Sequence, residues 1–169
     1  NRPALLNALS DIPKTKAASH LHALIVVSLQ NAMELKSAFG FDITEAVIRQ
    51  SANRYQDILQ NQAQVYRIDT EQLGILIENR DAQTIDTLLT ELIKGAQQPY
   101  QFNAIPIHVD SRLGYVTFNK LVQAPELYLQ RAESALISAN EKVLDCVAYS
   151  PEISNFAKEN LSLLGNLMS

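Results

Sequence analysis

One stretch, residues 65–77 ("VYRIDTEQLGILI"), restricts the possible folds more than any other part of the chain. Two apolar runs flank the polar centre Asp69-Thr70-Glu71-Gln72, and this pattern predicts two strands joined by a tight turn. Hairpin tips usually carry glycine or asparagine, which supply a positive φ at low cost. This tip carries neither and holds two acids instead, so its side chains are candidates for a functional site.

Helical patterns surround the hairpin. Asp42 with Glu45 three residues later fits a capping box, and Asp81 precedes apolar residues at helical spacing. Gly40 is placed to end a short helix, and Pro125 to begin a long one. We expect helices over residues 2–9 and 31–39, from Asp42 to the hairpin, from Asp81 to Pro99, and from Pro125 onward.

Strand patterns complete the chain. The stretch 20–30 ("HLHALIVVSLQ") is apolar and contains β-branched residues, which is typical of a buried strand. Further strands are expected over residues 104–109, 113–118 and 143–149, and residues 10–19 are polar enough for a loop. The order αβααββαββαβα predicts an α+β fold, with helices packed on a central, largely antiparallel sheet.

Composition excludes several functions. The 169 residues are 47% hydrophobic and 19% charged, and they suffice for one domain with a core. A net charge of −4 without a basic block disfavours nucleic-acid binding, and no apolar run approaches the ~20 residues of a membrane span. The single Cys146 sits among apolar residues, so we expect a buried thiol in a reducing, cytoplasmic setting. The start at Asn1 suggests a piece of a longer protein.

Searches for chemistry leave only the hairpin tip. The five glycines form no phosphate-binding loop, and Cys146 has no evident base partner. His20 and His22 share one face of the strand over residues 20–30, near its start, but His108 lies far off in the sequence; we expect edge-facing histidines and no metal site. Asp69 and Glu71 alternate in an extended segment and therefore share a face, although a solvated tip explains them as well.

Several strings, in order, resemble signatures of the GGDEF (diguanylate cyclase) family. "ALIVVSLQNAMELKSAFG" is similar to the family's DxDxFKxxNDxxG strand, "VYRIDTEQLGILI" to R-x-GGDEF-x-x-L, "RLGYV" to its SIG strand, and "RAESALISAN" to its AD-x-ALY-x-AK helix. The opening "NRPALLNAL" resembles the end of "LTGLPNR" and the helix that follows it. The resemblance covers residues 1–149 and implies the family's nucleotide-cyclase-like sheet of about five strands, with a ferredoxin-like core flanked by helices.

The resemblance also implies where the family's site lies. In the family, two glycines of the signature let the backbone approach the nucleotide, and acids bind two divalent metals that assist attack on GTP. Here the signature reads Asp69-Thr70-Glu71-Gln72-Leu73, so both glycines are replaced and Glu71 is the one acid kept in place. Gln72 is a neutral amide where the family has a carboxylate.

Other functional positions depart as well. The first-strand metal aspartate corresponds to Ser28, so Ser28 and Glu71 mark a vestigial metal site. The guanine-reading asparagine corresponds to Lys36, the second guanine-reading acid to Glu45, and the phosphate-contacting lysine to Asn140. Arg67 is retained, with a scaffold role as plausible as a ligand role. The product-inhibition motif R-x-x-D is absent, since Gln60 and Ala63 occupy its positions.

These departures predict a catalytically inactive GGDEF domain, a regulatory or scaffolding module in cyclic di-GMP signalling that controls an adjacent domain. The alternatives are a module that binds GTP without turning it over and, last, a residual cyclase. No cofactor is expected under the first hypothesis, and GTP with Mg²⁺ only under an alternative. Insertion of this segment into a membrane is not expected.

The end of the chain predicts a connection. Residues 1–149 would form the domain, and residues 150–169, after Ser150-Pro151, would form a connecting helix toward a downstream EAL-type domain of the same chain. An apolar stripe in residues 153–168 supports that helix, which could instead pack back on this domain. A homodimer is a further option.

Overall fold

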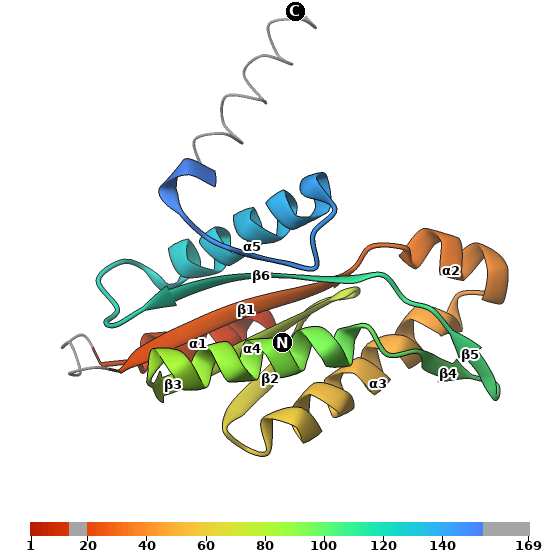
Figure 1. Ribbon diagram of the computed structural model, residues 1–169, viewed down its shortest axis with the longest axis horizontal. Helices are drawn as coiled ribbons and strands as arrows, with labels where there is room; N and C mark the ends of the chain where they lie inside the picture. Colours follow the sequence, from red (N-terminus) through yellow and green to blue (C-terminus); the bar gives the residue numbers. More distant parts are fainter. Residues whose placement is uncertain (14–19, 154–169) are drawn as a thin grey trace, which may run out of the picture.

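The computed structural model describes residues 1–13 and 20–153 and confirms the expected α+β fold. A five-stranded sheet carries helices on both faces (Figure 1). The elements are α1 (Arg2–Ser10), β1 (Leu21–Leu29), α2 (Ala32–Phe39), α3 (Asp42–Leu59), β2 (Ala63–Asp69), β3 (Gln72–Arg80), α4 (Ala82–Ala96), β4 (Tyr100–Phe102), β5 (Ile105–Ile107), β6 (Ser111–Phe118), α5 (Pro125–Lys142) and β7 (Cys146–Ala148).

The main sheet has the strand order β2-β3-β1-β6-β7, so β1 lies at its centre. All neighbours are antiparallel except β6 and β7, which are parallel because α5 carries the chain back across the sheet between them. The predicted hairpin is present as β2 and β3, with Asp69 paired to Gln72 at its tip.

β1 supplies two hydrophobic cores because its successive side chains point to opposite faces. Ala23, Ile25 and Val27 pack with α3 and α4 on one face, whereas Leu24 and Val26 pack with α1 and α5 on the other. Eight of its nine residues are buried, as is usual for a strand covered by helices on both sides.

The helix caps were predicted with mixed success. Asp81 caps α4 by accepting a hydrogen bond from the Thr84 amide at 2.7 Å, as expected. The capping box at Asp42 and Glu45 is wrong. Asp42 is already the first helical residue, and the Glu45 carboxylate binds arginines instead of the helix end.

Three further expectations need correction. The strand predicted over 104–109 is the second half of a separate hairpin, β4–β5, because Asn103 and Ala104 adopt left-handed backbone conformations and reverse the chain. The strand predicted over residues 143–149 is confined to Cys146–Ala148. His22 is buried in the central strand, not at an edge. The amphipathic stretch predicted for 153–168 lies almost wholly outside the described residues.

Among residues 1–13 and 20–153, no helix is both long enough and apolar enough to cross a bilayer.

Candidate functional site at the β2–β3 hairpin tip

The tip of the β2–β3 hairpin is a two-residue turn formed by Thr70 and Glu71. Neither residue has a positive φ, so the turn itself does not require the missing glycines. Asp69 turns its carboxylate back onto the chain, and its Oδ1 accepts a hydrogen bond from the Thr70 amide at 2.7 Å. Asp69 thus stabilises its own turn.

The sheet brings Ser28 to this tip. Ser28, near the end of β1, is the cross-strand partner of Gln72, and the next amide, Leu29 N, donates to the Glu71 carbonyl at 3.1 Å. Ser28 and residues 69–72 together line a pocket of about 270 Å³. That volume lies just below the range of roughly 300–1,000 Å³ that is common for small-molecule sites.

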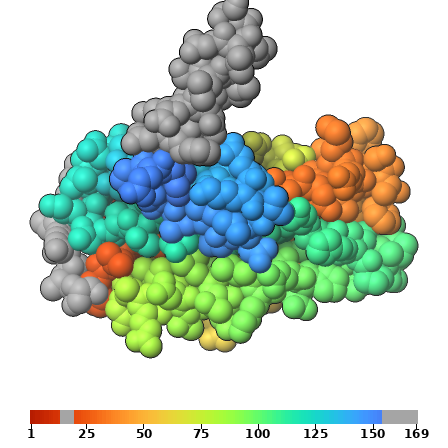
Figure 2. All heavy atoms as spheres, turned by 45° about the horizontal axis from the view of Figure 1, so that its top comes forward, coloured from red at the N-terminus to blue at the C-terminus, as the bar shows by residue number. Residues whose placement is uncertain are grey.

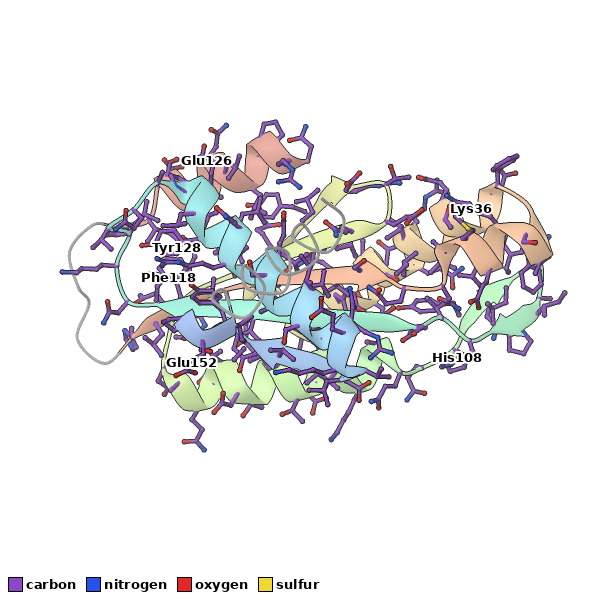
Figure 3. All side chains as sticks on the ribbon, turned by 90° about the horizontal axis from the view of Figure 1, so that it is seen from above. Lys36, His108, Phe118, Glu126, Tyr128 and Glu152 are labelled. Atoms are coloured by element: carbon purple, nitrogen blue, oxygen red, sulfur yellow. The ribbon has the colours of Figure 1, made fainter. Side chains whose placement is uncertain are left out.

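The carboxylate of Glu71 is already bound by a cation of the same chain. Lys36, on α2, donates from Nζ to Glu71 Oε1 at 2.9 Å, and both side chains are about one-third exposed (33% and 35%). Figure 3 labels Lys36 on its helix. This ion pair joins α2 to the hairpin tip.

A second ion pair joins α3 to the same tip. Arg67 binds Glu45 with both terminal nitrogens, at 2.8 and 2.7 Å, and its Nη2 also donates to the Thr70 carbonyl at 3.1 Å. Arg49 approaches the same carboxylate at 3.5 Å. The hydrogen bonds from Arg67 hold the pKa of Glu45 below its usual value. Glu45 is therefore ionised and forms an ion pair with Arg67.

The donor set at the tip does not fit a divalent metal, which prefers several free carboxylate oxygens. Ser28 and Gln72 are neutral, Glu71 is paired with Lys36, and Asp69 accepts the Thr70 amide. In the described part of the chain, no three His, Cys, Asp or Glu side chains gather closely enough to hold a metal ion.

The remaining expected positions lie elsewhere. Asn140 is near the end of α5 with its Oδ1 buried and without a hydrogen-bond partner, and none of the described hydrogen bonds links it to the tip. Leu73 is a core residue, 1% exposed. Gln60 has a left-handed backbone at the end of α3, and Ala63 begins β2 at the end opposite the tip.

The other candidate side chains have structural surroundings. His22 Nδ1 accepts a hydrogen bond from the Asn79 amide at 3.1 Å, and burial lowers the pKa of His22. Cys146 is half-buried, and burial raises the pKa of its thiol to about 11, which keeps it protonated and unreactive at neutral pH.

Residues 1–144 match the family model described as "Diguanylate cyclase, GGDEF domain". The chain belongs to the GGDEF family. A curated relative, the bifunctional diguanylate cyclase/cyclic di-GMP phosphodiesterase MucR of Pseudomonas aeruginosa, is 22% identical over 146 residues, which are 86% of this chain. These residues span only about a fifth (21%) of MucR.

Solved structures of GGDEF proteins have the same fold. An EAL/GGDEF domain protein from M. capsulatus superposes with a TM-score of 0.73 at 20% identity, over 87% of this chain and 94% of that one. The diguanylate cyclase SiaD of P. aeruginosa, solved in complex with its activator SiaC, gives 0.78 at 17% identity, over 88% of this chain and 58% of that one. At these identities the likeness concerns the fold.

Sequence reasoning therefore located the GGDEF hairpin and the strand beside it, but it missed both ion pairs. It treated Lys36 as a lost guanine reader and Arg67 as unassigned. One signal could have revealed the first pair, because a lysine replaces a neutral residue on the segment expected to face the tip acids. Nothing in the sequence specifies the bidentate Arg67–Glu45 geometry.

Proposed function

We propose that this GGDEF domain is a non-catalytic regulatory or scaffolding module in cyclic di-GMP signalling. The observation that carries the proposal is the 2.9 Å ion pair between Lys36 Nζ and Glu71 Oε1. Glu71 is the acid retained at the motif's metal-binding position, and a side chain of the same chain already satisfies it. A metal ion would have to displace this ammonium group and then find a single carboxylate.

Charge balance at the tip supports the same conclusion. A triphosphate brings roughly three to four negative charges, which phosphoryl-transfer sites neutralise with metal ions and basic groups. Ser28 and Gln72 are neutral and provide no carboxylate to hold a metal ion. Asp69 adds a negative charge beside the place that the phosphates would take. Loss of one well-placed charged group costs about 3–4 kcal/mol of transition-state stabilisation, and several are missing here.

The positions that would recognise guanine are also engaged. Lys36 is bound to Glu71, and Glu45 is held by Arg67 through two hydrogen bonds. A guanine base would need to break these contacts before either side chain could bind it. This occupancy argues against the alternative in which GTP binds without turnover.

The partner domain is inferred from relatives. MucR combines a cyclase with a phosphodiesterase, and the M. capsulatus protein joins EAL to GGDEF. We infer that this domain likewise adjoins an EAL-type domain in a cytoplasmic part of its protein and influences that domain through contact. Residues 150–169, which would make the connection, remain a proposal in this role.

The test is a turnover assay with a binding control. The protein is incubated with GTP and either Mg²⁺ or Mn²⁺, and the nucleotides are separated by chromatography beside a heat-killed sample and an active cyclase. We expect GTP to remain unchanged. Cyclic di-GMP above the heat-killed control would overturn the proposal.

Calorimetric titration separates the two non-catalytic roles. No heat of binding is expected from GTP with Mg²⁺ when Glu71 is bound by Lys36 and Glu45 is bound by Arg67. A saturable signal without turnover would instead support the GTP-binding module.

A further inference from the structure

α2 and the β4–β5 hairpin lie near each other at one end of the molecule (Figures 1 and 2), and exposed apolar side chains are found on these elements. Phe41 is 87% exposed, Met33 84%, Ile105 50% and Phe39 38%. We call these four residues, with Phe102, the Phe41 surface. Aromatic residues and methionine are enriched in protein interfaces, whereas side chains as exposed as Phe41 and Met33 contribute little to the core.

Part of the Phe41 surface is continuous across two elements. The rings of Phe39 and Phe102 meet edge to face, with 6.3 Å between centroids, and Phe102 is the cross-strand partner of Ile105. On α2, Met33 borders a groove of about 450 Å³ that Glu34, Ser37 and Ala38 also line. One apolar member of the surface therefore lies beside a hollow that is lined mainly by polar side chains.

The surface is held in place before any partner binds. Asn31, which precedes α2, accepts from the Asp110 amide at 2.9 Å, and the Gln30 amide donates to the Asp110 carbonyl at 2.7 Å. On the other side, Gln50 of α3 accepts from the Gln101 amide of β4 at 3.1 Å. A surface fixed in this way needs little ordering when it docks.

Charge selects the kind of partner. Glu34 and Asp42 are exposed beside the apolar groups and form no ion pair with the described residues. The cation on α2, Lys36, is turned to Glu71. The rim is therefore acidic, and a complementary partner carries lysine or arginine around apolar side chains.

The same rim disfavours two other occupants. A symmetric dimer through this surface would place Glu34 and Asp42 of one copy against the same acids of the other, because a two-fold interface pairs a patch with itself. An anionic membrane attracts basic segments and would be repelled here. We propose that the Phe41 surface binds a basic amphipathic segment of a protein partner.

The experiment uses two short helical peptides with identical leucine spacing, one completed with lysine and one with glutamate. Fluorescence anisotropy measures their affinity for the chain, and amide NMR shifts locate the contact. We expect the leucine–lysine peptide to bind and to shift signals of α2, residues 40–42 and β4–β5, and the leucine–glutamate peptide to bind much more weakly.

Variants make the result specific. Phe41→Ser should weaken binding of the leucine–lysine peptide by about tenfold, as loss of a central aromatic anchor does. Ile137→Ser, at an exposed apolar residue on α5 (51%), is the control on another element and should leave affinity unchanged. Phe41 is too exposed for its loss to unfold the chain, and circular dichroism checks this.

Three outcomes would overturn the proposal. The first is equal affinity of wild type and Phe41→Ser, or NMR shifts confined to another face. The second is concentration-dependent dimerisation that Phe41→Ser abolishes, which would assign the surface to a second copy. The third is binding to anionic vesicles that the same variant abolishes.

Discussion

At the scale of single residues, acids at and beside the tip of the GGDEF hairpin are bound by cations of the same chain. Lys36 and Arg67 bind the acids that could otherwise face a metal or a base. Each pair is about one-third exposed or more, so solvent screening keeps its contribution to folding stability small. The effect of these pairs is therefore on the availability of the acids, far more than on folding.

The signature glycines can be restored to test this view. We expect the double variant Asp69→Gly, Thr70→Gly to remain inactive with GTP and Mg²⁺, because Ser28, Gln72 and Asn140 still lack the charges that the family's motif implies. Catalytic groups that act as a unit are not recovered one at a time. Chromatography of the reaction mixture is the measurement, and measurable turnover would show the site to be more intact than we infer.

His22 gives a prediction for pH. Its Nδ1 must be unprotonated to accept a hydrogen bond from the Asn79 amide, and burial lowers the pKa of folded His22 below its usual value of 6.5. The unfolded chain therefore takes up a proton first as the pH falls below about 6.5. The stabilisation that neutral His22 contributes to the folded state is complete above that pH and is lost below it. The free energy of unfolding changes by at most about 1.4 kcal/mol per pH unit in this range.

Urea unfolding between pH 7.5 and 5.5 measures this slope. His22→Gln should flatten it, whereas His108→Gln, at an exposed histidine, should leave it unchanged. Equal slopes in all three proteins would exclude the linkage.

At the scale of elements, β6 and α5 pack closely against each other at Gly114. A Cβ atom at Gly114 would stand 2.6 Å from the Ala132 carbonyl oxygen and from Leu136 Cα, and closer still to the Leu136 amide nitrogen. Only glycine lets the helix backbone approach the strand this closely. This contact sets the distance of α5 from the sheet.

Gly114→Ala is therefore expected to lower the free energy of unfolding by about 1–3 kcal/mol or more, since the helix backbone must move. Gly95→Ala is the matched control. There the new atom meets the end of the Ile58 side chain, which can rotate, and alanine favours the helix by up to about 1 kcal/mol. Urea titration compares them, and an equal loss in both would contradict the packing argument.

The elements also show what sequence can predict. The two apolar runs of residues 65–77 with their polar centre, and the acid at Asp81, act locally, so the hairpin and the α4 cap were predictable. The box at Asp42 and Glu45 failed because Arg67, which is distant in sequence, binds Glu45. β4 was missed because the turn at Asn103 and Ala104 has no strong sequence signal. The first failure therefore comes from a contact between distant residues, and the second from a local turn without a distinctive sequence.

At the scale of the whole molecule, the two ends of the β2–β3 hairpin differ in the charged side chains that they carry. The tip holds the two ion pairs, whereas the opposite end begins at Gln60 and Ala63, where the family's motif would place an arginine and an aspartate. Because position 60 holds no arginine, we propose that this end of the hairpin does not bind the phosphates of cyclic di-GMP.

We therefore expect no saturable binding of cyclic di-GMP at low micromolar concentration. Calorimetric titration of the chain with the dinucleotide provides the measurement, and a GGDEF domain that retains R-x-x-D is the positive control. Tight, saturable binding here would mean that another surface recognises the dinucleotide.

The central position of β1 has a consequence for synthesis on the ribosome. One edge of β1 pairs with β3, but the other edge pairs with β6, which begins at Ser111 and is synthesised later. The face formed by Leu24 and Val26 is likewise not covered until α5 has been synthesised. At about 5–20 residues per second, β6 follows the end of β1 after roughly 4–16 s. For those seconds the most apolar strand of the nascent chain has an open edge, and a chaperone that covers it would protect the chain from aggregation.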